Sequence, residues 1–342
     1  MRRFLPFGLV VVHLLGSPVW AGGPEYEVLQ PVESRSGLIL ESARGKARIE
    51  RQGAAPQRLA LQANEILTAI AETRGGWTAA GVREENSATK IIVVNRSTQG
   101  TRRLSAPALQ RHPLRLRPTL AVEDDELDGM AWLEGPDLTS LSVRAASRAQ
   151  GEWQDVTIVA PPARGSQTGL VITVLNNGNW LLAWSAFDGS DDEILWSMGQ
   201  QDSWSVPSRL GNGNSVPDIM PALVSTPDGA LLTWSRLIKG QYHLMLSRFR
   251  GNGWSPPRVI GPPGSLEPGF SVQDGQLLLL YRHAWPQGWA ITELSADGRA
   301  NRLAVVSEGV PSRPVLVSSS GESVELRWAG RNQRTVGWEA VP

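Results

Sequence analysis

The sequence predicts an all-β protein, a six-bladed β-propeller whose blades are four-stranded antiparallel sheets. Three observations predict this fold. A unit of about 50 residues recurs six times between residue 60 and the C-terminus. Each unit contains two apolar strands joined by a glycine-containing turn, and no helical pattern follows the N-terminus. Repetition at a fixed period indicates a repeat architecture, and blades of four short strands are typical of propellers.

The spacing of the units is regular. The second strand of each unit closes at an equivalent position, and the separations between these positions are 51, 52, 50, 47 and 47 residues. The closing residues are Gly81, Trp132, Trp184, Trp234, Tyr281 and Trp328. This regularity favours a propeller over the alternative, a pair of β-sandwiches, which does not require equal repeat lengths. In the first unit the closing aromatic is lost at Gly81.

The first two strands of a unit are expected to form a hairpin. Asn-Gly and Asp-Gly pairs between apolar runs are strong hairpin signals, because both residues accept positive φ angles. These pairs are Asp128-Gly129, Asn177-Gly178, Asp228-Gly229 and Asp274-Gly275. The leucine runs beside them are apolar on both faces, as expected of strands packed between two sheets.

Third and fourth strands follow each hairpin. Residues 193–197, 242–247 and 289–295 show the third strand, and Trp153, Trp204 and Trp254 open the fourth. Prolines follow the last two of these tryptophans and fit only an edge strand, which needs no second ladder partner.

The last unit reaches only its third strand, at residues 335–341, before the chain ends at Pro342. Residues 56–62 resemble the missing fourth strand. We therefore predict that residues 58–62 pair with the strand near 335–341 and close the last blade. The expected organisation is a signal peptide at 1–21, an N-terminal extension at 22–55 and the propeller at 56–342.

The N-terminus resembles a secretory signal. Arg2 and Arg3 precede a short apolar stretch, and Val19-Trp20-Ala21 supplies a small-residue cleavage site. The apolar stretch is too short to span a bilayer. We therefore expect an exported protein, periplasmic or extracellular, with no membrane span.

Composition narrows the possible partners. The chain has 33 basic and 33 acidic side chains, so no basic field exists to hold a nucleic acid. It has no cysteine, which excludes disulfides and thiolate metal sites. We expect a monomer without a cofactor or metal, whose partner is a glycan, a peptide or an envelope protein.

One segment carries a family resemblance. Ser247-Arg-Phe-Arg-Gly251-Asn-Gly-Trp254 resembles the Asp-box, or BNR repeat, of sialidase-like propellers, Ser-x-Asp-x-Gly-x-Thr-Trp. Phe249 replaces the aspartate and Gly253 the threonine. The resemblance covers about 280 residues in layout, while every individual box is degenerate. It implies the six-bladed fold and says nothing about chemistry, because the box is a turn-stabilising device.

The resemblance implies no catalytic residue in this chain. Sialidases of the family use three arginines, a tyrosine nucleophile paired with a glutamate, and an aspartic acid/base. The early Arg-Ile-Pro signature of the family is absent. Tyr281 occupies the structural aromatic position, Tyr242 begins a third strand, and Tyr26 lies outside the repeat. We therefore assign no catalytic residue.

Candidate ligand-binding residues come from loops that share one face of a propeller. These loops join one blade to the next or join second to third strands. The candidates are Arg117, Asp188, Asp218, Arg236, Glu267, Arg282, His283, Arg313 and Arg331. Arg117, Glu267 and Arg313 each precede the proline that opens an inner strand, so we expect them to point toward the central axis. The alternative is that these charges only pair with one another around the rim.

Three functions remain open from the sequence. The leading hypothesis is an exported, non-catalytic propeller that binds a carbohydrate, peptide or protein partner at its channel face. A glycoside hydrolase or lyase of sialidase-like fold is the second, and it would need two carboxylates facing each other across a sugar. A structural module of a cell-envelope assembly is the third. The acidic run Asp188–Glu193 also resembles a calcium loop, although it lacks the length of an EF-hand loop.

Overall fold

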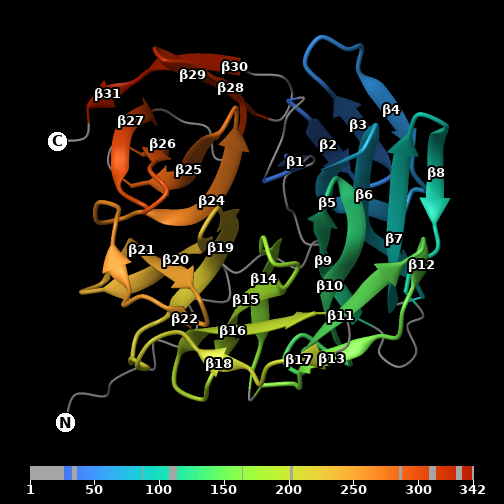
Figure 1. The fold of residues 1–342 in the computed structure, drawn as a ribbon, viewed down its shortest axis with the longest axis horizontal. Coiled ribbons are helices and arrows are strands. Elements are labelled where there is room, and N and C mark those ends of the chain that lie inside the picture. Colours follow the sequence, from blue (N-terminus) through green and yellow to red (C-terminus); the bar gives the residue numbers. More distant parts are fainter. Residues whose placement is uncertain are drawn as a thin grey trace.

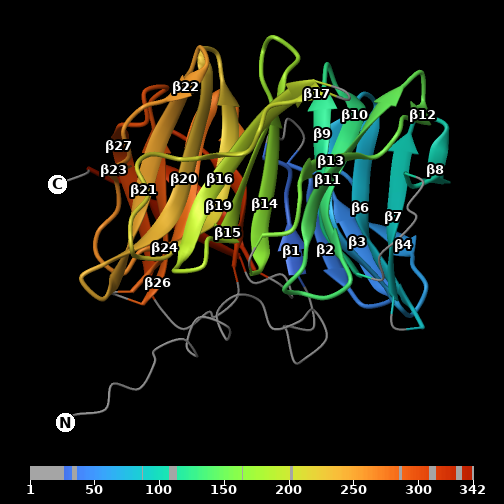
Figure 2. The same cartoon turned by 90° about the horizontal axis from the view of Figure 1, so that it is seen from below.

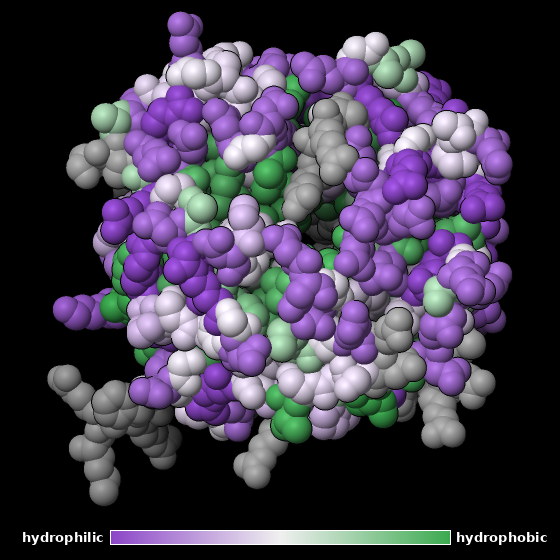
Figure 3. Space-filling model, viewed as in Figure 1, coloured by the Kyte–Doolittle hydropathy of each residue, from purple (hydrophilic) through white to green (hydrophobic). Residues whose placement is uncertain are grey.

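The computed structural model describes residues 27–32, 37–86, 88–107, 114–163, 165–200, 203–284, 287–307, 313–328 and 333–340. In these residues seven antiparallel sheets follow one another around a ring (Figure 1). Their strands run between the two faces of the ring (Figure 2). One face is largely hydrophilic and is hollowed near its centre (Figure 3). The expected propeller is therefore confirmed, with seven blades in place of six.

The first four blades are contiguous in sequence. The first contains β1 (Glu27–Leu29), β2 (Ile39–Ala43), β3 (Lys46–Glu50) and β4 (Gln57–Ala60). The second contains β5 (Glu65–Thr73), β6 (Gly76–Glu85), β7 (Ala88–Ser97) and β8 (Gly100–Leu104). The third contains β9 (Leu114–Glu123), β10 (Glu126–Gly135), β11 (Ser142–Ala149), β12 (Glu152–Trp153) and β13 (Thr157–Ala160). The fourth contains β14 (Gln167–Val174), β15 (Trp180–Phe187), β16 (Asp192–Gln200), β17 (Ser203–Trp204) and β18 (Ser208–Arg209).

The last three blades complete the ring. The fifth contains β19 (Asp218–Thr226), β20 (Gly229–Ile238), β21 (Gln241–Arg250), β22 (Gly253–Trp254) and β23 (Arg258–Val259). The sixth contains β24 (Leu266–Gln273), β25 (Gln276–His283), β26 (Gly288–Leu294) and β27 (Ala300–Ser307). The seventh contains β28 (Val315–Ser319), β29 (Ser323–Arg327) and β30 (Gln333–Gly337). The final strand, β31 (Glu339–Ala340), pairs with β27 of the sixth blade.

The prediction of six four-stranded blades was wrong, and so was the predicted closing strand. β4 pairs with β3, in the register Lys46↔Ala60, and takes no part in the last blade. Residues 27–60 form a blade of their own. Its strands are only three to five residues long, and, like the second blade, it lacks a closing aromatic. Sequence periodicity therefore missed it.

Side-chain contacts join the first blade to the last ones. Arg327 of β29 forms ion pairs with Glu41, at 2.6 Å, and with Glu50 of the first blade. Gln30 accepts a hydrogen bond from the backbone N–H of Leu316 and donates one to Ser271. In the described residues, no strand is shared between the first blade and the seventh.

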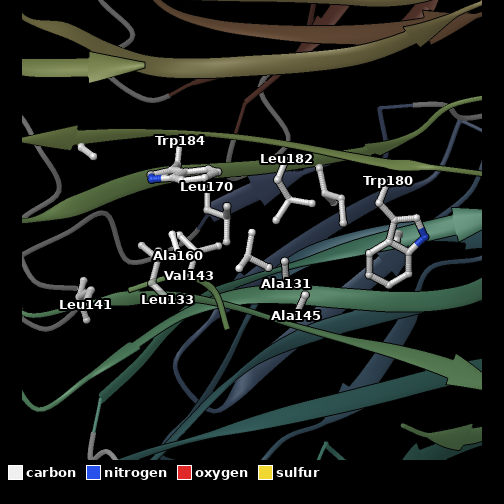
Figure 4. Packing of buried hydrophobic residues seen from close by; sticks show 14 residues of the cluster. Ala131, Leu133, Leu141, Val143, Ala145, Ala160, Leu170, Trp180, Leu182 and Trp184 are labelled. Atoms are coloured by element: carbon white, nitrogen blue, oxygen red, sulfur yellow. The ribbon is translucent and has the colours of Figure 1, made fainter. Parts of the chain in front are cut away.

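The hydrophobic core lies between neighbouring blades. Figure 4 shows the cluster between the third and fourth blades, where Trp180, Leu182 and Trp184 of β15 pack with Ala131 and Val143. The closing aromatics are buried at equivalent places, with Trp132, Trp184 and Trp234 fully inaccessible and Trp328 1% exposed. Tyr281 is 4% exposed and belongs to the core cluster between the fifth and sixth blades, as expected of that position.

Two glycines lie where a side chain would clash with neighbouring atoms, and one of them corrects a predicted hairpin turn. The β9–β10 turn lies at Asp124-Asp125, with φ angles of 48° and 63°, and not at Asp128-Gly129. Gly129 lies within β10 at a bulge, where a Cβ atom would come within 2.0 Å of the Trp180 ring. At Gly81, a Cβ atom would lie 1.9 Å from the backbone oxygen of Ile66. The aromatic is therefore absent from the second blade because backbone approaches that position.

The outer edges of the third, fourth and fifth blades are split strands. In each blade the segment that opens with tryptophan pairs with the third strand in two short pieces. Pro207, Pro256 and Pro257 fall in the gaps between these pieces. This placement satisfies the rule that proline, which lacks an N–H donor, belongs at an edge. No helix of the described residues is long and apolar enough to cross a membrane.

Candidate functional site

Charged residues recur in several blades where the inner strand begins and its partner strand ends. The register places Glu65 opposite Arg83, Arg115 opposite Glu134, and Asp218 opposite Arg236. In the sixth blade Arg282 lies opposite Leu266, next to Glu267. The innermost strands of the blades all run in the same direction along the channel axis. The positions where they begin therefore lie at one mouth of the channel. We call this set of pairs the charged mouth.

Asp218 and Arg236 form its most complete pair. Arg236 donates from Nε to Oδ1 at 2.7 Å and from Nη2 to Oδ2 at 2.6 Å. Trp234 Nε1 and Asn214 Nδ2 donate to the same carboxylate, at 3.0 Å each. Asp218 is 1% exposed, so all its acceptor capacity is used within the protein. The hydrogen bonds that Arg236 donates to Asp218 are the main cause that raises the pKa of Arg236.

Bulges in the inner strands orient other mouth residues. Arg117, Met220 and Glu267 occupy equivalent bulges and have φ angles of 46°, 57° and 58°. Each precedes a proline, which restricts its backbone, and positive φ is strained for residues with a Cβ atom. Glu267 accepts a hydrogen bond from Arg282 at 3.2 Å. Arg117 is exposed; on an innermost strand, an exposed side chain faces the channel or its mouth.

Arg313 reaches from the seventh blade onto β24. Its Nη2 lies 3.4 Å from the backbone oxygen of Pro268. It also lies 1.5 Å from the place that a Cβ atom on Gly269 would occupy, so glycine is needed for this approach. Burial among surrounding atoms lowers the pKa of Arg313, and the charge of Glu267 opposes this effect. Part of the side chain remains exposed.

Two further sequence candidates are His283, which the structure describes, and Arg331, which it does not. His283 ends β25 and is half-buried, and its ring lies 6.4 Å from that of Tyr281. Arg331 lies outside the described residues. The structure thus brings Asp218 to Arg236, Glu267 to Arg282, and Arg313 to the Glu267 segment.

A group of acidic residues lies beside the Asp218–Arg236 pair, in and after the β15–β16 loop. Asp188 accepts hydrogen bonds from the backbone N–H groups of Ser190 and Asp191, at 2.8 and 3.3 Å. Asp191 and Asp192 are each 7% exposed, and Glu193 is 1% exposed. Burial raises the pKa of Asp192 to about 6, with further contributions from the charges of Asp191 and Asp188.

Arg209 and Asn214 hold this group from the next loop. Arg209 pairs with Asp188 at 2.7 Å and with Glu193 at 3.4 Å. The backbone N–H of Asn214 donates to Glu193 at 2.8 Å. Sequence reasoning missed both residues because they lie 16 to 21 positions from their partners and match no motif. It did include Glu193, both as the start of a third strand and as the end of the acidic run, but it could not show that its carboxylate is buried.

A cavity of about 270 Å³ lies between the first and second blades, toward the face of the ring opposite the charged mouth. Its lining includes Trp77, Gly75 and Thr98. Gly75 and Thr98 belong to turns at the ends of β5 and β7 that are remote from Glu65 and Arg83. None of the sequence candidates lines this cavity.

Comparisons with known proteins support the fold and give no family. No family model matches the chain, and no curated protein matches it. A protein of unknown function from Dyadobacter fermentans is similar in structure, with a TM-score of 0.51 and 15% identity over 80% of this chain and 94% of that one. The propeller domain of the Trilobed protease from Pyrococcus furiosus gives 0.52 and 10% over 93% and 95%.

The polysaccharide lyase Uly1 gives a TM-score of 0.53 and 8% identity over 94% of this chain and 90% of that one. At such identities the similarity establishes a β-propeller and nothing about activity. The resemblance to sialidases stays a prediction.

Proposed function

We propose that this protein is an exported, non-catalytic propeller that binds a carbohydrate, peptide or protein partner at its charged mouth. The proposal rests on one observation: Arg117 and Arg313 have no carboxylate partner among the described residues. Other mouth arginines are committed to carboxylates, as Arg236 is to Asp218 and Arg282 to Glu267. Among the described residues, no carboxylate lies within 4.0 Å of the side-chain nitrogens of Arg117 or Arg313.

These two guanidinium groups favour an anionic ligand. Arginine pairs bidentately with carboxylates, and such charge-assisted hydrogen bonds are stronger than neutral ones. A uronic or sialic acid unit, or an acidic peptide, offers the matching group. Arg313 is already held against Gly269, so less side-chain entropy is lost when it binds.

The arrangement of carboxylates supports a role without catalysis. A glycosidase needs two carboxylates that face each other across the sugar. Asp218 is saturated by four hydrogen bonds, and Glu267 is paired with Arg282. Both carboxylates are thus occupied in holding the mouth together. The rim pairing expected as the alternative therefore accounts for these residues, while Arg117 and Arg313 remain available.

The test is binding to arrays of acidic glycans and acidic peptides, followed by titration calorimetry with the best binder. Replacing Arg117 and Arg313 together by alanine should weaken binding at least about tenfold, because one hydrogen bond to a charged group contributes about 1.5–3 kcal/mol. The matched control is Arg299→Ala, which removes an arginine that is 82% exposed and paired with Asp297.

Two results would overturn the proposal. One is binding that Arg299→Ala weakens as much as the double replacement does. The other is turnover of the bound glycan, detected as new reducing ends or unsaturated products, which would favour the hydrolase or lyase alternative.

A further inference from the structure

Asp191 is a buried carboxylate without a donor. It is 7% exposed, and both of its oxygens are buried with no hydrogen-bond partner among the described residues. The neighbouring carboxylates do have donors: Asp188 and Glu193 each accept hydrogen bonds from a backbone N–H group and from Arg209. Burying an unpaired carboxylate is strongly unfavourable unless it binds a cation or keeps a proton.

The carboxylate lies among potential ligands. One oxygen each of Asp188, Asp191 and Glu193 lie within 4.8 Å of one another. Asp188 is on the solvent side, with 27% of its side chain exposed, and the other two are buried. The backbone hydrogen bonds to Asp188 fix the loop that carries Asp191. The group therefore has a fixed inner wall and an open side where water could complete a coordination shell.

The charges of the group do not balance. Asp188, Asp191, Asp192, Glu193 and Asp218 are its five carboxylates, and Arg209 and Arg236 face them. Arg236 is taken up by Asp218, and Arg209 is shared between Asp188 and Glu193. Burial and the charges of Asp188 and Asp218 accordingly raise the pKa of Asp191. An excess of negative charge remains beside Asp191 when the carboxylates are ionised.

We propose that Asp188, Asp191 and Glu193 bind a divalent cation, with Ca²⁺ as the favoured ion. All three offer carboxylate oxygens, which suit hard cations and not the softer metals that prefer imidazole or thiolate. Calcium tolerates irregular geometry and accepts water ligands, whereas Mg²⁺ requires a near-ideal octahedron. This site is distinct from the pair Arg117 and Arg313 and does not depend on the function proposed above.

Arg209 gives the proposal a specific consequence. Its guanidinium binds Asp188 and Glu193, so it competes with a cation for two of the three ligands. Arg209→Gln should therefore tighten cation binding. If the carboxylates were instead neutralised only by protons and Arg209, the wild-type chain would bind no cation.

The experiment is calorimetric titration of the purified, EDTA-treated chain with CaCl₂, and with MgCl₂ and MnCl₂ in parallel, together with thermal unfolding. We expect saturable binding of one Ca²⁺ and a melting temperature that rises with its concentration. Asp191→Asn should weaken binding at least about tenfold, since even outer-shell changes reduce metal affinity by that amount. Without metal, Asp191→Asn should raise the melting temperature, because it removes an unpaired buried charge.

The matched control is Asp137→Asn. Asp137 lies in the equivalent loop of the third blade and makes the same turn contact, to the N–H of Thr139 at 2.9 Å. Its calcium titration should equal that of the wild type. The proposal is overturned by the absence of saturable binding of all three ions, or by equal binding in Asp191→Asn. A response to Mg²⁺ without one to Ca²⁺ would overturn the calcium assignment. Replacing Arg117 and Arg313 should leave calcium binding unchanged.

Discussion

Arg236 binds both carboxylate oxygens of Asp218 through two parallel hydrogen bonds, at 2.7 and 2.6 Å. The pair joins the first residue of an innermost strand to the strand beside it. Trp234, the closing aromatic of this blade, donates to the same carboxylate. One buried ion pair thus connects the hydrophobic core to the channel mouth.

Loss of this carboxylate should destabilise the protein strongly. Asp218→Asn leaves the Arg236 guanidinium without its charged partner, and breaking a buried pair on one side lowers the free energy of unfolding by about 3–5 kcal/mol. Denaturant titration measures the change. Asp228→Asn is the control, because Asp228 is 55% exposed and pairs with Arg248 and Arg250 at the surface. It should have an effect of about 0–1 kcal/mol; similar losses in both variants would contradict the assigned role.

The second blade should not accept a side chain at position 81. Gly81→Ala would place a Cβ atom 1.9 Å from the Ile66 oxygen, and such overpacking lowers the free energy of unfolding by about 1–3 kcal/mol or more. Gly253→Ala is the matched change, because no atom lies within 4 Å of its added Cβ. Thermal unfolding compares the two. A Gly81→Ala protein as stable as Gly253→Ala would show that the strands can separate freely there.

Closure of the ring should depend on Arg327. Arg327→Met leaves Glu41 and Glu50 without the guanidinium that joins the first blade to the seventh. Arg48 still pairs with both carboxylates, so we expect a loss of about 1–3 kcal/mol in the free energy of unfolding. Hydrogen exchange should show faster opening in β2, β3 and β29 than in β15 and β20. A uniform change across all blades would contradict a local role in closure. Arg248→Met is a suitable comparison, since Arg248 pairs with Asp228 inside the fifth blade.

Glu65 should make stability depend on acid pH. Burial alone would raise the pKa of Glu65, but hydrogen bonds from Arg103 and the backbone of Gln62, with the charges of Arg103 and Arg83, lower it overall from the ordinary 4.5. A lowered folded-state pKa gives stabilisation that is complete above the unfolded value and is lost as pH falls through the folded value.

The comparison of wild type with Glu65→Gln tests this. At neutral pH the variant should be less stable by about 1–3 kcal/mol, because Arg103, whose side chain is 44% exposed, loses the carboxylate to which it donates two hydrogen bonds. The difference should shrink as pH falls below 4.5, since glutamine resembles protonated glutamate. Glu126→Gln, at a side chain that is 73% exposed, should show no such trend. A difference independent of pH would exclude the ionised pair as its cause.

The correct and incorrect predictions have separate physical origins. The fold class, the closing aromatics and most hairpins followed from patterns within 50 residues, where spacing records which side chains are buried. The first blade was missed because its strands are short and lack an aromatic. The turn at Asp124-Asp125 was misplaced because two aspartates adopted positive φ where an Asp-Gly pair nearby was the stronger local signal.

Period and strand order are local properties of a chain, and they were enough to predict a ring of repeated β-sheets with one set of loops at a shared mouth. The number of blades, the pairing of Asp218 with Arg236, and the isolation of Asp191 from hydrogen-bond donors are visible only in the folded chain. These features depend on contacts that spacing does not specify, some within a blade, such as Asp218 with Arg236, and some between blades, such as Arg327 with Glu41 across 286 positions of the chain. Charge pairing and burial are set by neighbours in space, and no periodicity of the sequence specifies which neighbours those are.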